Sequence, residues 1–97
     1  MTASPINPED RFEIRPPFMF RWEDSQNAHV LLYPEGIVKL NKSGGDTLSL
    51  CDGKTSVAEL IETLINTYDA SAADVIRNGV MHFLEVSRGK GWIRIKA

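Results

Sequence analysis

The sequence predicts an α+β domain in which a three-stranded antiparallel sheet is followed by three helices and a short C-terminal extended segment. Between residues 18 and 23, aromatic side chains recur at every second position, which is the period of a half-buried strand, and two further short apolar segments follow before residue 41. After residue 40 the apolar period changes to about 3.6, the period of an amphipathic helix. The chain has 97 residues, which is the length of one domain.

Residues 1–17 are predicted to be a flexible, Pro-rich N-terminal arm, and residues 18–97 to form the domain. Four of the five prolines lie in the arm, at Pro5, Pro8, Pro16 and Pro17, among charged side chains. A segment of this composition cannot bury enough apolar surface to order itself alone. Phe12 and Ile14 are the apolar exceptions, and they could dock either on the domain or on a neighbouring molecule.

Three strands are expected between residues 18 and 40. In the first, residues 18–23, the aromatic side chains alternate with Met19, Arg21 and Glu23, so one face is buried. The second, residues 29–33, is apolar enough to lie in the middle of the sheet. Residues 34–36, Pro-Glu-Gly, suit a hairpin turn because proline fixes φ and glycine accepts a positive φ. The third strand, residues 37–40, is short, as edge strands often are.

The first helix is expected to begin after Asn41, a good N-cap, and to end before Gly53 as the C′ residue. Its apolar positions are Gly44, Leu48 and Cys51. Glycine lowers helix propensity by roughly 1 kcal/mol relative to alanine. We therefore expect Gly44 and its neighbour Gly45 to serve a close approach of this helix to the sheet.

The second helix has the clearest signal, because Ser56 and Glu59 have the spacing of a capping box. The third helix is expected to begin after Ser71 as its N-cap and to end at Gly89, before an extended segment at residues 92–95. The apolar stripes are Val57, Leu60, Ile61, Leu64, Ile65 and Tyr68 in the second helix, and Ala72, Ile76, Val80, Phe83, Leu84 and Ser87 in the third. A sheet with two helices joined by a tight turn is a winged-helix-like arrangement.

The net charge and the cysteine content limit the partners and the cellular compartment that we expect for this protein. Eleven Lys and Arg residues stand against 13 Asp and Glu, a net charge of −2, whereas binding to nucleic acid usually requires a basic surface. The single thiol, Cys51, cannot form an internal disulfide, which favours a reducing compartment. The polar start of the chain predicts no signal peptide, and no apolar run reaches the roughly 20 residues of a membrane helix. We expect a cytoplasmic protein that binds no membrane.

The sequence contains no pattern of catalytic or metal-binding residues. His29 and His82 are the only histidines, and they lie far apart with no ligand spacing to Cys51, so no metal site is expected. Residues 43–46, Ser-Gly-Gly-Asp, lack the glycine spacing and the Lys-Ser/Thr pair of a phosphate-binding loop. Cys51 lies on the apolar side of a helix, where a buried, inert thiol is usual. The chain is therefore interpreted as a binding protein, without a cofactor, and not as an enzyme.

The run of residues 29–41, HVLLYPEGIVKLN, resembles the signature of the PqqD family, the peptide chaperones of pyrroloquinoline quinone (PQQ) biosynthesis. Further similar segments are Leu50–Gly53, Ser56–Ile61, Phe83–Leu84 and Arg88–Ile93, so the resemblance covers residues 18–95. It implies a winged-helix-like domain that binds the ribosomal precursor peptide. It also implies presentation of that peptide to a radical S-adenosylmethionine enzyme, which cross-links a Glu and a Tyr in it. Residues 43–45, Ser-Gly-Gly, depart from the family's Ala-rich helix start.

The predicted mechanism is the addition of the peptide as a strand to the third strand, with its other side against the third helix. The expected peptide-binding residues are Ile37, Val38, Lys39, Leu40, Val75, Asn78, Gly79 and His82. Two of them have alternative interpretations. Gly79 either lets a peptide backbone approach or packs against the sheet within the domain. Lys39 either pairs with a peptide carboxylate or protects the edge from aggregation.

Two other functions are kept as alternatives. A winged-helix nucleic-acid binder would use the third helix, which presents Arg77, Asn78 and Arg88, with Asp74 and Glu85 offsetting the charge. A carrier of the quinone product is suggested by the pathway alone. A homodimer is also conceivable, through the arm or through pairing of two strand edges.

Overall fold

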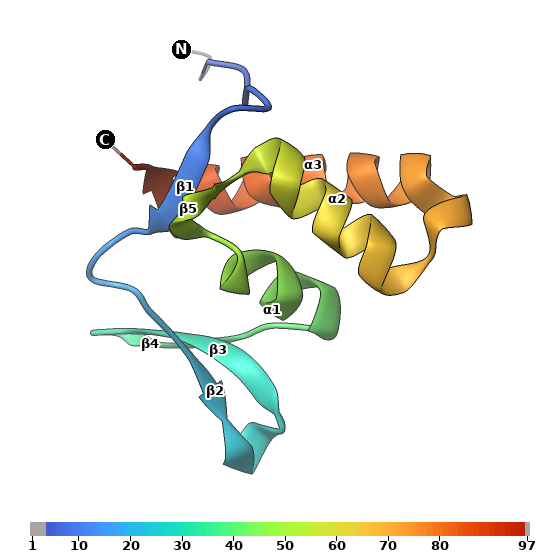
Figure 1. Ribbon diagram of the computed structural model, residues 1–97. Coiled ribbons are helices and arrows are strands. Elements are labelled where there is room, and N and C mark those ends of the chain that lie inside the picture. Colours follow the sequence, from blue (N-terminus) through green and yellow to red (C-terminus); the bar gives the residue numbers. More distant parts are fainter. Residues whose placement is uncertain (1–3, 97) are drawn as a thin grey trace.

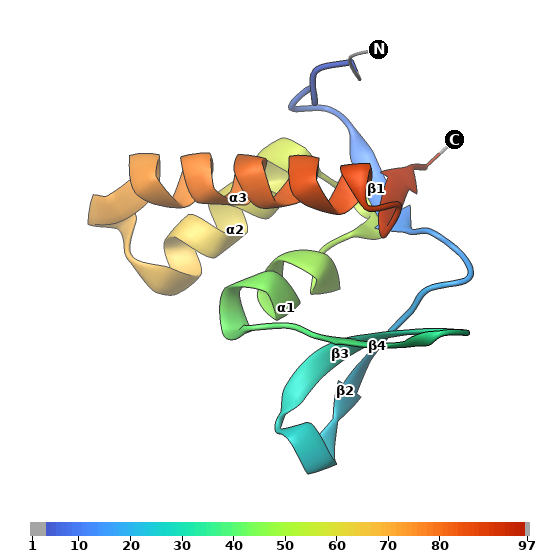
Figure 2. The same ribbon diagram turned by 180° about the vertical axis from the view of Figure 1, so that it is seen from behind.

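The structure is a computed structural model that describes residues 4–96 (Figure 1). It contains two three-stranded antiparallel sheets and three helices. The elements are β1 (Arg11–Ile14), β2 (Met19–Glu23), β3 (Ala28–Tyr33), β4 (Gly36–Lys39), α1 (Lys42–Ser49), β5 (Asp52–Ser56), α2 (Val57–Tyr68), α3 (Ala73–Gly89) and β6 (Ile93–Ile95), with 3-10 turns at Asp24–Gln26 and Ala70–Ala72. In Figures 1 and 2, α1 lies between the β2–β3–β4 sheet on one side and α2 and α3 on the other.

The sheet β2–β3–β4 is the one that the sequence predicts. β3 is its central strand and β4 an edge strand, so both predicted positions are confirmed. The hairpin turn closes with Tyr33 opposite Gly36, which leaves Pro34 and Glu35 as the two turn residues. One face of this sheet contacts α1. The apolar side chains of Leu31 and Val38 on that face belong to the same core as the buried residues of α1.

The sheet β5–β1–β6 is not predicted by the sequence pattern. Its central strand, β1, is made of residues from the expected flexible arm, and Phe12 is only 1% exposed. The expectation of a flexible arm is therefore wrong for residues 11–14, and Phe12 docks on its own domain. The physical reason is that β1 has two partner strands, and Glu13 also accepts a hydrogen bond from Arg94 Nε at 2.8 Å. The expected C-terminal extended segment is confirmed as β6.

Two predicted helix ends are also corrected. α1 ends at Ser49, and Gly53 is not its C′ residue but lies in β5 with a φ of +77°. α3 begins at Ala73, after the 3-10 turn, and Ser71 is not its N-cap. Instead, the Asp69 carboxylate accepts hydrogen bonds from the Ser71 backbone N–H and hydroxyl at 3.0 and 2.7 Å. Asp69 thus caps the 3-10 turn that precedes α3, and because aspartate and serine are equally good caps, the sequence does not distinguish them.

The predicted caps at Asn41 and Ser56 are confirmed, whereas Gly36, expected in the turn, lies in β4, and Tyr68, expected on the apolar stripe of α2, is exposed. The Asn41 side chain accepts a hydrogen bond from Gly44 N at 2.8 Å, and Ser56 and Glu59 form the reciprocal bonds of a capping box at 3.2 and 2.9 Å. A Cβ at Gly45 would lie 2.7 Å from His29 Nδ1, and one at Gly44 would lie 3.2 Å from the Phe83 ring. Gly45 thus serves the expected close approach to the sheet, whereas the expectation for Gly44 is corrected, because Gly44 allows α1 to approach α3.

Cys51 is 4% exposed, and burial raises the pKa of its thiol to about 12. The carboxylate of Asp52 raises the same pKa further, by charge repulsion of the thiolate. The thiolate is the reactive form of cysteine, and it is not populated at neutral pH when the pKa is this high. The expected burial of Cys51 is confirmed, and the raised pKa agrees with the interpretation of an unreactive thiol.

Ser87 in α3 is fully buried, and its hydroxyl has no hydrogen-bond partner among the described residues. A buried hydroxyl without a partner costs about 1–3 kcal/mol. Replacing Ser87 with alanine is therefore expected to raise the free energy of unfolding by about 1 kcal/mol, measured by urea denaturation. Ser56→Ala is the matched control, because the Ser56 hydroxyl is used as a cap and its loss should cost about 1 kcal/mol. A loss of stability in Ser87→Ala would contradict this account.

Candidate functional site

The free edge of β4 offers unpaired backbone groups in a fixed pattern. Among residues 4–96, β4 pairs with β3 alone, in the register Tyr33–Gly36, Leu32–Ile37, Leu31–Val38 and Val30–Lys39. Just beyond this register, Leu40 N donates to His29 O at 3.0 Å, so Leu40 is bonded to β3. In an antiparallel pair, bonded and non-bonded positions alternate. Ile37 and Lys39 are therefore the residues whose N–H and C=O groups point away from β3, which gives four groups for an added strand.

The side chains of this edge alternate between two faces. Val38 is half-buried and Leu40 is buried, and both belong to the core on the α1 side. Ile37 is 51% exposed and Lys39 is exposed, and they point to the opposite, outer face. The four predicted edge residues thus have different surroundings: a strand added to this edge would bond to Ile37 and Lys39 and would contact Val38 on its inner side.

The predicted flank of α3 is exposed, and one of its four residues, Gly79, lines a cavity. Val75, Asn78, Gly79 and His82 are all exposed, and Val75 is 74% exposed. A cavity of about 240 Å³ lies between α3 and the start of α1, and Gly79 lines it. A Cβ at Gly79 would meet no atom within 4 Å among the described residues. Gly79 therefore does not pack against the sheet, and the open side of α3 is left free at this position.

Sequence reasoning missed several residues of this cavity. Ile76, Val80 and Phe83 are predicted as core residues, yet all three line the cavity, and Ile76 and Phe83 are only half-buried. Ile76 and Phe83 lie three residues before and four residues after Gly79, so they share its side of the helix. That spacing around an exposed helical glycine is the signal that could have identified them. The remaining lining residues are Asn41, Ser43, Thr47 and Tyr68.

One lining residue of the cavity, Tyr68, belongs to a small polar cluster that joins α1 to the end of α2. The Tyr68 hydroxyl donates a hydrogen bond to the Asp46 carboxylate, which also pairs with Lys42 Nζ at 2.9 Å. The bond from Tyr68 is the main cause that lowers the pKa of Asp46. Burial, and then the contact with Asp46, raises the pKa of Tyr68 to about 12. Tyr68 is therefore a permanent donor at neutral pH, and the cluster fixes the position of this lining residue.

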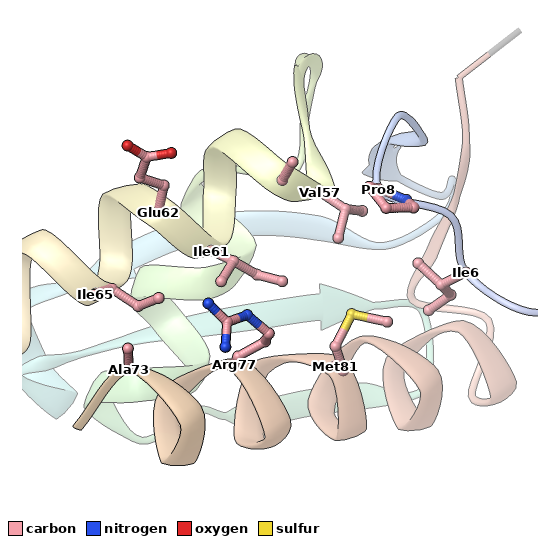
Figure 3. Close-up of a pocket in the computed structure, with 10 residues that line it drawn as sticks. Ile6, Pro8, Val57, Ile61, Glu62, Ile65, Ala73, Arg77 and Met81 are labelled. Atoms are coloured by element: carbon pink, nitrogen blue, oxygen red, sulfur yellow. The ribbon is translucent and has the colours of Figure 1, made fainter. Parts of the chain in front are cut away.

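A second, more apolar groove lies on the other flank of α3 (Figure 3). It has a volume of about 540 Å³ and runs between α2 and α3, lined by Ile61 and Ile65 from α2 and by Ala73, Arg77 and Met81 from α3. Ile6 and Pro8 line one end, as Figure 3 shows. Arg77 forms an ion pair with Asp74 at 2.9 Å. This groove contains none of the predicted site residues.

Within residues 4–96, no group of three or more His, Cys, Asp and Glu side chains is placed to hold a metal ion. His29 lies in β3, where its ring stacks on Phe20 with ring centroids 4.8 Å apart, and His82 is exposed on α3. No helix of the described part is both long enough and apolar enough to cross a membrane. The arrangement presents a strand edge and a neighbouring cavity for binding.

Comparison with known proteins gives consistent matches. A family model described as "Coenzyme PQQ synthesis protein D (PqqD)" matches residues 28–93. A "PqqA binding protein" of Azotobacter vinelandii is 45% identical over 83 residues, which cover 86% of this chain and 88% of that protein. A "PqqA binding protein" of Methylococcus capsulatus is 36% identical over 89 residues, which cover 92% of each chain.

The fold also matches a solved structure. The solution NMR structure of the PqqD truncation of Methylobacterium extorquens PqqCD superposes with a TM-score of 0.73 and 26% sequence identity, over 92% of this chain and 94% of that one. That protein is described as a functional and stand-alone recognition element for ribosomally synthesised and post-translationally modified peptides.

Proposed function

The chain belongs to the PqqD family, and on that premise we propose that it binds the PqqA-type precursor peptide of PQQ biosynthesis and presents it to the radical S-adenosylmethionine enzyme of the pathway. The role is non-catalytic binding, as in the relatives described as PqqA binding proteins and in the recognition element of similar fold. The β-hairpin and the tightly linked α2 and α3 support a winged-helix-like description of the fold.

The observation that carries the mechanism is the free edge of β4. An extended peptide that pairs with Ile37 and Lys39 becomes a fourth strand of the β2–β3–β4 sheet. Alternate side chains of that strand point to the inner side, where Val38 lies. The cavity beside Gly79 begins at Asn41, two residues beyond Lys39. Backbone bonds then supply sequence-independent affinity, and the cavity selects side chains. We propose the eight predicted residues as the binding region, with Ile76 and Phe83 added.

An NMR titration of the isotope-labelled protein with the precursor peptide tests this proposal. The expected result is that chemical-shift changes concentrate at residues 36–41 and 75–83. Changes centred on Ile61, Ile65 and Met81 would place the peptide in the α2–α3 groove instead. Absence of binding, both alone and with the enzyme added, would overturn the proposed function itself.

Replacing Gly79 with alanine is expected to have opposite effects on stability and on binding. The new methyl group meets no atom in the free protein, and alanine favours a helix by about 1 kcal/mol over glycine. The free energy of unfolding should therefore rise by about that amount. Peptide affinity should fall, by about threefold or more, if a peptide backbone approaches this position. Gly89→Ala is a control, since a Cβ there also meets nothing and Gly89 lies outside the cavity. Unchanged peptide affinity would show that the peptide does not approach Gly79.

The two alternative functions have less support. For nucleic acid, the charge of Arg77 is already paired with Asp74, and the net charge is −2. The same ion pair counts against binding of the quinone product, because Arg77 is the one cation among the described lining residues of the α2–α3 groove. Titration of duplex DNA at low salt and of the quinone, each followed by NMR, separates these functions from peptide binding.

We also propose that any self-association uses the free edge of β4, because a bare edge can pair with a second copy. Residues 11–14 pair within their own domain in the structure, so fewer residues of the N-terminal arm are available to exchange with those of a second copy. Self-association through β4 would compete with the peptide for the same backbone groups. The buried thiol of Cys51 suits a reducing compartment, and we place the protein in the cytoplasm on that ground.

A further inference from the structure

The outer face of the β2–β3–β4 sheet carries an apolar row that ends at the free edge. Met19 lies opposite Leu32, and Leu32 lies opposite Ile37, so one residue of each strand contributes to the row. Met19 is 58% exposed and Ile37 is 51% exposed. α1 packs on the other face of this sheet, as Figures 1 and 2 show. The row is therefore an apolar surface whose last member, Ile37, stands beside the position of an added strand.

A second row of the same face carries positive charge. Arg21 lies opposite Val30, and Val30 lies opposite Lys39, two residues further along β4 than Ile37. The ion pairs among residues 4–96 involve Lys42, Arg77, Arg94 and Lys96, and neither Arg21 nor Lys39 takes part in one. The charged row thus ends at the free edge with a cation that has no acidic partner in the described part of the chain.

A strand added to β4 extends both rows. Its side chains on the outer face are two residues apart, which is also the spacing of Ile37 and Lys39. Side chains that face each other across neighbouring strands favour apolar pairs and opposite charges, each worth up to about fivefold in an equilibrium constant. The residue between them points to the inner face, toward Val38.

We infer that β4 recognises two side chains of its peptide on the outer face. One is an apolar residue beside Ile37, and the other, two positions away in the peptide, is a Glu or Asp beside Lys39. This inference rests on the proposed function, because it assumes that a peptide strand pairs with β4. It assigns Lys39 to recognition of a carboxylate rather than to protection of the edge alone. It also defines the class of ligand, an extended segment with an apolar and an acidic residue at positions i and i+2 in either direction.

The first test uses the full chain and a fluorescently labelled PqqA-type precursor peptide, with affinity measured by anisotropy at about 0.15 M salt. Lys39→Glu should weaken binding about five- to twentyfold, because an attraction is replaced by a repulsion. Arg21→Glu is the matched control: it makes the same change of charge on the same face, but on β2, two strands from the edge. Its effect should stay below about threefold, since the peptide strand would lie three strand spacings from β2, about 14 Å, and the screening length at this salt concentration is about 8 Å.

The second test identifies the peptide residues. Each Glu or Asp of the peptide is changed to Lys in turn and measured against the Lys39→Glu protein. One reversal should restore the affinity to within about threefold of the original pair. An apolar residue should lie two positions from that acid, and its change to alanine should weaken binding to the original protein but not to Ile37→Ala.

The outcomes separate the two proposals. If the unmodified protein does not bind the peptide, the proposed function fails and this inference fails with it. In another outcome the protein binds, but no single change of an acidic peptide residue to Lys restores affinity for Lys39→Glu, or the acidic residue that does so has no apolar residue two positions away. Either result overturns the proposed recognition of two side chains and leaves the proposed function standing. Equal losses in Lys39→Glu and Arg21→Glu would also overturn that recognition, because they would show a long-range effect of net charge.

Discussion

Replacing Ile37 with proline is expected to weaken peptide binding at least tenfold while the protein stays folded. The N–H of Ile37 points away from β3, so its loss breaks no bond of the sheet. Proline at such an edge position is tolerated for this reason. An added strand, however, loses one donor and meets the proline ring where a backbone carbonyl should dock. Binding is measured by isothermal titration calorimetry, and the fold is checked by circular dichroism and urea denaturation.

Two control variants make this prediction specific to the direction of the N–H. Val38→Pro removes an N–H that bonds to β3, so it should destabilise the protein itself, by about 1–3 kcal/mol. Ile37→Thr keeps the outward N–H and a β-branched side chain, so it should lower affinity by less than about fivefold. Full binding by Ile37→Pro would show that the peptide does not pair with β4, even if it binds elsewhere on the protein.

Replacing Phe12 with alanine is expected to cost about 3–5 kcal/mol of unfolding free energy. Phe12 is 1% exposed in the central strand of the β5–β1–β6 sheet, and the cavity left by the ring would lie in the main core. For a domain whose total stability is about 5–15 kcal/mol, this is a large fraction. Urea denaturation measures the loss, and Met19→Ala serves as the control because Met19 is 58% exposed. A loss below about 1 kcal/mol would mean that residues 11–14 do behave as a detachable arm.

Features that depend on neighbouring residues could be predicted from the sequence. The capping box of Ser56 and Glu59, the cap at Asn41 and the hairpin turn near Pro34 each arise from residues within four positions of one another, although the turn is one residue shorter than predicted. β3 and β4 were predictable for a second reason, because their hydrophobic pattern differs between a central and an edge strand. A free strand edge is therefore present at the expected residues, and its binding of a peptide stays a prediction.

The β5–β1–β6 sheet could not be predicted in the same way. β1 and β5 are joined by pairs such as Arg11–Ser56, which are 45 positions apart in the sequence. β5, with the sequence Asp-Gly-Lys-Thr-Ser, has no alternating apolar pattern, so its strand conformation depends on its partner rather than on its own residues. The same limit applies to the cavity: whether Ile76 and Phe83 face the core or a groove is decided by where α1 lies.

The alternation of bonds along β4 also determines how firmly a bound peptide is held in one position. Because only Ile37 and Lys39 offer outward groups, any extended segment can satisfy the same four bonds after sliding by two residues. A slide by one residue would instead exchange the two faces of every side chain. The backbone thus sets the spacing of the allowed alignments, and the side chains choose among them. A peptide could advance along this edge in steps of two residues, losing its side-chain contacts at each step while re-forming every backbone bond.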